Sequence, residues 1–301
     1  MKIEHITSAF DGLSLELAIS VPAGTPRGIV QISHGMAEHK ERYFGFMEYL
    51  SQNGFICIIH DHRGHGASVR KAEDLGYFYT ADPDGIVNDL HQVTLYVKEH
   101  YPELPVYLFS HSMGTLVARN YLKKYDGAIE KLVLCGPPTY NGLSWLAIVL
   151  AHLTRLFRGD HHRSAFLNRL SDGSYNKGYR KEGEWLNSDR GEVERYHEDP
   201  LCGYTFTVSG YLNLFRLLHR AYRTRDWKVS HPELKILIIA GADDPVIQSP
   251  EKVDHLARFL QKRGYEVSGK KLYPGKKHEL LLEKEREEIY RDILHFLIGQ
   301  E

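Results

Sequence analysis

Ser110-His111-Ser112-Met113-Gly114 is the stretch that decides the fold. It follows the apolar run 106–109 and precedes the helix-like run 115–122. This order predicts a buried strand, a tight turn and a helix, with Ser112 at the apex of the turn. Small residues two positions before and after the apex let the backbone turn sharply without colliding with neighbouring strands. We therefore predict an exposed Ser112 hydroxyl at a helix N-terminus, where free N–H groups can bind an oxyanion.

Length and charge restrict the class of protein. The chain has 301 residues, of which 42% are hydrophobic, and its formal net charge is −1. This length suits one large α/β domain with an insertion, or two small domains. Acidic and basic residues are mixed along the chain, which argues against a nucleic-acid partner. No obligate protein partner is implied.

The cysteines and the N-terminal residues bear on the compartment. Cys57 and Cys135 lie in apolar, strand-like runs and are interpreted as buried free thiols, which suits a reducing compartment. The first 20 residues lack the continuous apolar core of a signal peptide. The longest apolar stretch, 143–156, contains His152 and is too short to span a bilayer. We expect a soluble, cytoplasmic protein.

Two kinds of apolar segment alternate along the chain. Short aliphatic runs are typical of buried parallel strands, and the amphipathic segments between them are typical of helices. Strands are expected at 28–33, 55–60, 106–109, 131–135 and 236–240, and helices at 43–53, 84–101, 115–125, 250–263 and 286–298. Such alternation predicts an α/β fold with a mostly parallel central sheet and helices on both faces. Segments 3–8 and 14–21 are expected to add an antiparallel hairpin at one edge.

The alternation breaks between Pro137 and Trp227, where the chain is helical but irregular. We assign residues 138–227 to a helical cap, or lid, inserted over the carboxyl edge of the sheet. Ligands bind at that edge in open α/β sheets. Residues 1–137 and 228–301 then form the catalytic core.

A general base and an acid should accompany Ser112. His278 follows a strand-like run and the turn Pro274-Gly275, and it precedes the last helix, so its loop can reach back to the serine. The acid should follow a strand between Ser112 and His278, and Asp243 and Asp244 both follow the strand at 236–240. Position alone favours neither aspartate. Either choice places the three residues in the chain order Ser, Asp, His.

The oxyanion site should combine two backbone donors. The loop 34–39 follows an expected strand, and Gly35 lets its backbone pass close to a substrate. We expect the N–H groups of Met36 and Met113 to point at the developing negative charge.

Several motifs together resemble the α/β-hydrolase superfamily, in its monoacylglycerol lipase and lysophospholipase-like branch. They are HGMAEHKERY at 34–43, DHRGHGAS at 61–68, SHSMG at 110–114, GADDPV at 241–246 and YPGKKHE at 273–279. The segment DPLCGYTFT at 199–207 is similar to the cap of this branch. The resemblance implies that the acid is Asp244, the aspartate before Pro-Val. The departure from the family pattern is Ser110, where glycine is usual.

The resemblance implies a serine hydrolase that cleaves carboxylic esters through an acyl-enzyme, with Ser112 as nucleophile, His278 as base and Asp244 as its partner. The expected substrate is a monoacylglycerol or a lysophospholipid, and no cofactor is expected. One alternative is a short-chain carboxylesterase with a closed cap pocket. Another, of a different class, is a non-catalytic binding protein that keeps the hydrolase fold.

The cap segment 143–157 has two apolar stripes at helical spacing, so it is apolar on both sides. Such a helix is either fully buried or faces something apolar. We favour an acyl-chain channel and single out Trp145, Ile148 and Val149 as candidate substrate contacts. The cap is also a candidate for transient contact with a membrane surface.

A metallohydrolase is a further alternative, because His60, His62 and His65 cluster in the sequence. The H-x-H-x-D-H pattern of one such class fails at Gly64, where an aspartate belongs. We therefore expect no metal at these histidines.

Overall fold

One eight-stranded sheet organises the molecule. The computed structural model describes residues 1–140, 142–171, 173, 175–177, 179 and 183–300. Within this part of the chain the strand order is β1-β2-β4-β3-β5-β6-β7-β8. The strands are β1 (Lys2–Thr7), β2 (Ser14–Ser20), β3 (Gly28–Ser33), β4 (Phe55–His60), β5 (Val106–His111), β6 (Lys131–Cys135), β7 (Lys235–Gly241) and β8 (Glu266–Tyr273).

The sheet is mostly parallel, as the alternating pattern predicts. From β4 to β8 every neighbouring pair is parallel, whereas β2 pairs antiparallel with both β1 and β4. The expected edge hairpin is therefore confirmed as β1 and β2. The carboxyl ends of the parallel strands meet at one edge of the sheet, so the loops that follow them lie close together.

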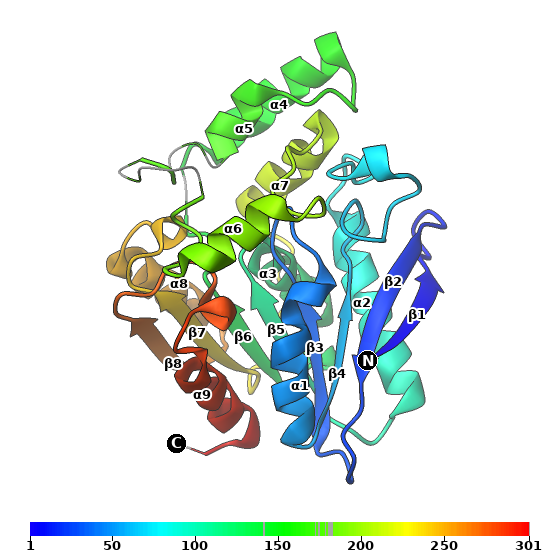
Figure 1. Cartoon of the computed structure of the whole chain (residues 1–301), viewed down its shortest axis with the longest axis vertical. Coiled ribbons are helices and arrows are strands. Elements are labelled where there is room, and N and C mark those ends of the chain that lie inside the picture. The colour runs from blue at the N-terminus through cyan, green and yellow to red at the C-terminus, as the bar shows by residue number, and fades with distance from the viewer. Residues whose placement is uncertain (141, 172, 174, 178, 180–182, 301) are drawn as a thin grey trace.

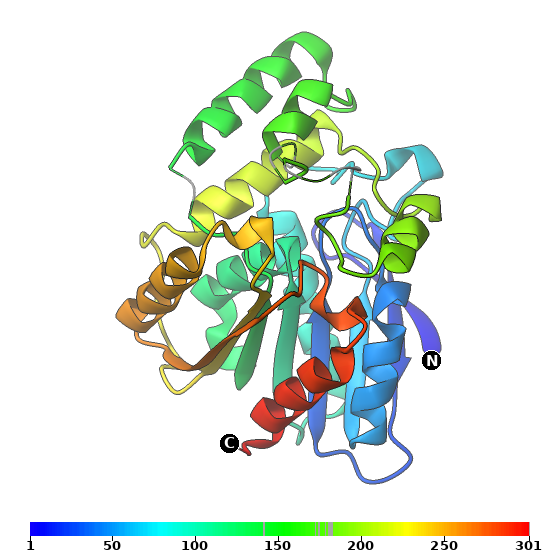
Figure 2. The same ribbon diagram turned by 60° about the vertical axis from the view of Figure 1, so that its left-hand side comes forward.

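Helices cover both faces of the sheet (Figures 1 and 2). One buried cluster contains apolar residues of α2, α3 and α8, and the other contains residues of α1 and α9. These helices are α1 (Phe44–Gln52), α2 (Asp84–His100), α3 (Met113–Tyr125), α8 (Pro250–Arg263) and α9 (Arg286–Ile298). The predicted helices at these places are confirmed.

The central strands are apolar on both sides because helices cover both faces of the sheet. In β4, Ile56 and Ile58 belong to the first cluster, while Cys57 and Ile59 belong to the second. Successive side chains of a strand point to opposite faces, so a strand covered on both faces is apolar throughout. This explains why short aliphatic runs mark these strands in the sequence.

The segment 138–227, which we expect to form the cap and call the insertion below, lies between β6 and β7. Its helices in the described residues are α4 (Ser144–Arg158), α5 (Ala165–Ser171), α6 (Arg190–Glu198) and α7 (Val208–Ala221). Figure 1 shows α4 and α5 stacked beyond α7, and α6 lying across the end of the sheet. The residues outside the described part of the chain, apart from Glu301, all fall within this insertion. Among the described residues, no helix has both the length and the apolar character needed to cross a membrane.

Candidate active site

Ser112 sits at a strained turn between β5 and α3. Its φ is 50° and its ψ is −118°, a conformation that residues other than glycine rarely adopt. The Ser112 amide donates to the Cys135 carbonyl of β6 over 3.0 Å, which holds the turn against the sheet. The sequence predicted an exposed Ser112 hydroxyl. In the structure the side chain is half-buried and lines a cavity. Strain of this kind is typical of functional sites.

Gly114 and Ser110, the small residues two positions from Ser112, are accommodated in different ways. A Cβ atom on Gly114 would lie 2.2 Å from the Ser33 carbonyl oxygen, so only glycine fits there. Ser110 replaces the usual glycine and is fully buried, and its hydroxyl donates to the Val133 carbonyl over 2.8 Å. The hydroxyl thus has a partner in the neighbouring strand, and the turn keeps its shape.

The structure brings Ser112, His278 and Asp244 together. The Ser112 Oγ lies 2.8 Å from His278 Nε2, and His278 Nδ1 lies 2.8 Å from Asp244 Oδ2. The other Asp244 oxygen accepts the Val246 amide over 2.8 Å, so the carboxylate is held on both sides. This arrangement can pass a proton from the hydroxyl to the imidazole while the carboxylate orients the ring.

The structure also distinguishes the two adjacent aspartates. Asp244 is buried and faces His278, whereas Asp243 is exposed and its amide donates to the Lys276 carbonyl. Gly136 leaves room for this pair, because a Cβ atom there would lie 3.1 Å from the His278 ring. The aspartate that contacts His278 is the one selected by the family resemblance.

Opposing effects act on the pKa of His278. Burial lowers it, since the charged imidazolium loses its hydration, but the charge and hydrogen bond of Asp244 raise it more. The net result is a pKa raised above 6.5. His278 is therefore a stronger base than a histidine in water.

The loop after β3 approaches Ser112 closely. A Cβ atom on Gly35 would lie 3.2 Å from the Ser112 Cβ, and the Gly35 amide donates to Glu38 Oε1 over 2.5 Å. Met36 and Met113 both line the cavity beside Ser112. Neither amide donates to an acceptor within the described residues, so both N–H groups are available to a ligand.

Buried histidines support this loop. His34 Nε2 accepts the His62 amide over 2.9 Å, so the ring proton is on Nδ1, which donates to the Gly35 carbonyl over 2.8 Å. Burial lowers the pKa of His34 to about 4 and the pKa values of His60 and His65 to about 3. These rings are neutral at pH 7 and pack around one another, with the His34 and His62 ring centroids 4.3 Å apart.

A cavity of about 250 Å³ opens above Ser112. Apolar residues of α7 and at the start of α4 line part of it, namely Leu143 directly before α4, Ala147, Leu214, Phe215 and Leu218. A polar group also lines it: Arg42 contacts Glu38 over 2.8 Å and Glu279 over 2.6 Å. The Glu279 Oε2 atom is buried and has no hydrogen-bond partner among the described residues.

This polar group was not predicted from the sequence. Glu38 and Arg42 lie four residues apart within the motif at 34–43, and Glu279 directly follows His278. The spacing of the first pair was a usable signal, since residues four apart in a helical turn can form an ion pair. Trp185 was missed as well; its ring centroid lies 5.3 Å from that of His278.

Trp145, Ile148 and Val149 are not among the described residues that line the cavity. Trp145 and Val149 are exposed, at 56% and 44%, and Ile148 is partly buried against the core. The opposite side of α4 faces inward: Ser144 and Ala147 are buried and line the cavity, which Leu143, directly before α4, also lines. The side of α4 at the cavity is therefore not the side expected from the sequence, because a helix with two apolar stripes does not show which of them faces inward.

Together, the doubly covered parallel sheet, the strained serine between β5 and α3 and the Ser-His-Asp contacts define an α/β-hydrolase. Residues 24–285 match the family model described as serine aminopeptidase, S33. The chain belongs to this family.

Individual proteins similar to this chain define its class within the family more closely. It is 28% identical to a monoglyceride lipase of Rattus norvegicus, over 97% of this chain and 88% of the relative. It is 25% identical to a monoacylglycerol lipase of Mycolicibacterium smegmatis, over 98% of this chain and 97% of the relative. A thermostable carboxyl esterase from Bacillus coagulans, solved in complex with glycerol, superimposes with a TM-score of 0.91 at 26% identity, covering 99% of this chain and 98% of that one. The chain is accordingly a monoacylglycerol lipase-like ester hydrolase of the α/β-hydrolase fold.

Proposed function

We propose that this enzyme hydrolyses monoacylglycerols through an acyl-enzyme formed on Ser112. The observation that carries the proposal is the pair of 2.8 Å contacts from Ser112 Oγ to His278 Nε2 and from His278 Nδ1 to Asp244. These contacts activate a hydroxyl that is otherwise a weak nucleophile.

In the first half-reaction, His278 Nε2 takes the proton of Ser112 as Oγ attacks the ester carbonyl. The Met36 and Met113 amides donate to the resulting oxyanion, and Asp244 stabilises the imidazolium. The imidazolium then protonates the leaving alcohol as its C–O bond breaks. In the second half-reaction, His278 deprotonates a water that attacks the acyl carbon, which releases the acid and restores the Ser112 hydroxyl.

The cavity lining supports a neutral alcohol group in the substrate. Arg42 is the one arginine or lysine among the described residues that line the cavity, and Glu38 and Glu279 already neutralise it. A phosphate would meet these two carboxylates, and the described lining residues offer no other arginine or lysine to pair with it. The hydroxyls of glycerol, by contrast, can donate to the carboxylates of Glu38 and Glu279, which line the cavity. We therefore favour a monoacylglycerol over a lysophospholipid.

The insertion, residues 138–227, would act as the cap that holds the acyl chain. Its helices α4 and α7 supply apolar side chains to the cavity. The outer side of α4 is apolar as well, with Leu156 and Phe157 exposed at 77% and 79%. Since the substrate is itself a lipid, this outer side would touch a lipid surface briefly while the substrate enters.

A short-chain carboxylesterase is the second candidate. The modest size of the cavity favours it, as does the likeness to the carboxyl esterase solved with glycerol. In that case the cap would close over a small acyl group.

A substrate series tests the proposal. We would measure kcat/KM for monoacylglycerols of increasing chain length, the matching lysophosphatidylcholines, p-nitrophenyl acetate and aminoacyl p-nitroanilides. The proposal expects an optimum at long-chain monoacylglycerols. A preference for acetate would favour the second candidate, and faster cleavage of the anilides than of the esters would contradict both.

A further inference from the structure

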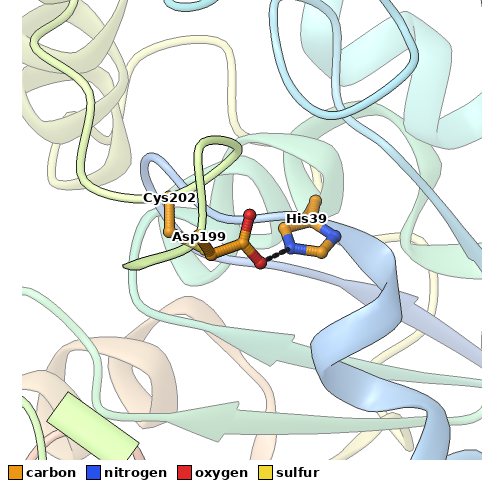
Figure 3. A group of neighbouring side chains, drawn as sticks. All are labelled: His39, Asp199 and Cys202. Atoms are coloured by element: carbon orange, nitrogen blue, oxygen red, sulfur yellow. Dashed lines mark hydrogen bonds and ion pairs between the residues drawn. The ribbon is translucent and has the colours of Figure 1, made fainter. Parts of the chain in front are cut away.

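A cluster of metal-ligating side chains lies where the insertion meets the loop after β3. His39 belongs to this loop, while Asp199 ends α6 and Cys202 follows it in the insertion. Figure 3 shows the Asp199 carboxylate pointing at the His39 imidazole, with Cys202 on the same segment as Asp199. One donor atom from each residue lies within 4.8 Å of the other two. These residues are not used by the proposed chemistry at Ser112.

Hydrogen bonds already orient each donor. His39 Nδ1 contacts Glu41 Oε2 over 2.5 Å, which leaves Nε2 directed at Asp199 Oδ2, 2.8 Å away. Asp199 Oδ1 accepts the Leu201 amide over 2.8 Å, which leaves Oδ2 as the oxygen that faces His39. The Cys202 amide donates to the Asp199 carbonyl over 3.0 Å, and this turn brings the thiol to the same place. A histidine whose second nitrogen contacts a carboxylate is typical of metal sites.

We propose that His39, Asp199 and Cys202 bind one zinc-class divalent ion that joins the insertion to the loop after β3. Nitrogen, oxygen and thiolate sulfur are the donors that Zn²⁺ takes in proteins, whereas Mg²⁺ and Ca²⁺ prefer oxygen alone. His39 and Cys202 are buried, but the Asp199 side chain is 32% exposed. Water can therefore reach the fourth tetrahedral position.

Binding requires the His39 and Asp199 donors to move slightly apart and the Cys202 sulfur, within 4.8 Å of both, to complete the site. In a tetrahedral zinc site with bonds of about 2.0 Å, neighbouring donors are separated by about 3.3 Å. His39 Nε2 and Asp199 Oδ2 are 2.8 Å apart, so they would move apart by about half an ångström to admit the ion. The ion would replace the proton shared by this pair and the proton of the Cys202 thiol, and both protons would be released to solvent.

The ion would strengthen a junction that already exists. The Gly203 amide donates to the Ala37 carbonyl over 2.9 Å, and the Tyr196 hydroxyl donates to the same oxygen over 3.1 Å. Ala37 directly follows Met36, so a metal at this junction would also fix the backbone next to the cavity. We expect bound metal to raise the unfolding temperature of the protein.

Cobalt titration of the full-length Ser112→Ala protein tests the site separately from the proposed hydrolysis. Metal-free protein would receive Co²⁺ in a non-thiol reductant, and the thiolate-to-cobalt absorption band would be recorded. We expect a band that saturates at one ion per chain, and Zn²⁺ should abolish it by competition. Surface binding by some of the 18 histidines cannot produce this band, because it requires a sulfur ligand.

Matched variants identify the ligands. Cys202→Ser should remove the band and the thermal stabilisation by Zn²⁺, whereas Cys57→Ala, which removes a buried thiol elsewhere, should leave both unchanged. Glu41→Gln should keep the band but weaken affinity by about 10–100-fold, as expected for a residue that orients a ligand.

Either of two results would overturn the proposal. The first is the absence of a thiolate band in protein whose circular dichroism is native, which would leave His39 and Asp199 as an ion pair only. The second is an unchanged band in Cys202→Ser. Loss of esterase activity in any variant has no bearing on either result.

Discussion

The turn at Ser112 and the helix α4 both line one cavity, yet they are constrained very differently. At the turn, Gly114 meets a backbone oxygen, the Ser110 hydroxyl has a fixed acceptor, and Ser112 has a strained φ. On α4, apolar residues occur on every side, and Phe157 is 79% exposed while Ala147 is buried. The comparison suggests that the core determines the chemistry and the insertion determines the choice of ester.

The sharpest way to break this comparison is to remove the nucleophile. Ser112→Ala should lower kcat by about 10⁴–10⁶-fold for every ester, whatever its chain length, because the attacking oxygen is gone. Hydrolysis of p-nitrophenyl esters and monoacylglycerols would be measured side by side. Activity retained on either substrate would mean that a different group performs the attack.

The two neighbouring aspartates offer a matched pair within the core. Asp244→Asn should lower kcat by about 10⁴-fold, since an amide cannot hold the required tautomer of His278 or stabilise its charge. Asp243→Asn changes the same chemical group on an exposed residue and should leave kcat within about twofold. Equal losses in the two variants would contradict the assignment of roles.

A change in the insertion should act on substrate choice instead. Ala147→Phe places a large ring in the cavity and should lower kcat/KM for long-chain monoacylglycerols by about 10–100-fold. Its effect on p-nitrophenyl acetate should be small, because the contacts of Ser112 with His278 and of His278 with Asp244 are unchanged. Trp145→Ala, on the exposed side of the same helix, is the control. An equal loss of kcat/KM for all chain lengths in Ala147→Phe would contradict the proposal that the insertion determines the choice of ester.

The outer side of α4 should matter only at a lipid surface. Leu156→Ser combined with Phe157→Ser should weaken partitioning onto phosphatidylcholine vesicles by about tenfold, since both side chains are largely exposed. Vesicle sedimentation would measure the binding, and p-nitrophenyl acetate in free solution would serve as the control. Unchanged partitioning would show that another part of the surface touches the lipid.

The pH dependence gives the smallest effect. Neutral His278 is the active form, so kcat/KM should rise with pH, and its midpoint should lie above 6.5 because Asp244 raises the pKa. Short and long esters should share this midpoint. The same shift stabilises the folded protein fully below the unfolded pKa and is lost as pH rises through the folded pKa. A midpoint below 6.5 would contradict the influence of Asp244.

The core could be predicted from the sequence more completely than the insertion. The strands, their flanking helices and the loops bearing Ser112 and His278 were predictable, because buried parallel strands leave clear aliphatic runs. The choice between Asp243 and Asp244 required the family resemblance, since both follow the same strand. The inward side of α4 could not be found, because its apolar residues are not confined to one side. The Glu38, Arg42 and Glu279 group was missed because Glu279 is distant in sequence from the other two.

The central claim is that His278 and Asp244 make the Ser112 oxygen a strong nucleophile. Its most direct test is peptide mass spectrometry after treatment of the native protein with a fluorophosphonate. We predict a single adduct on Ser112, formed in step with the loss of esterase activity and strongly slowed in His278→Ala. An adduct on another residue, or full activity after complete modification of Ser112, would contradict the account.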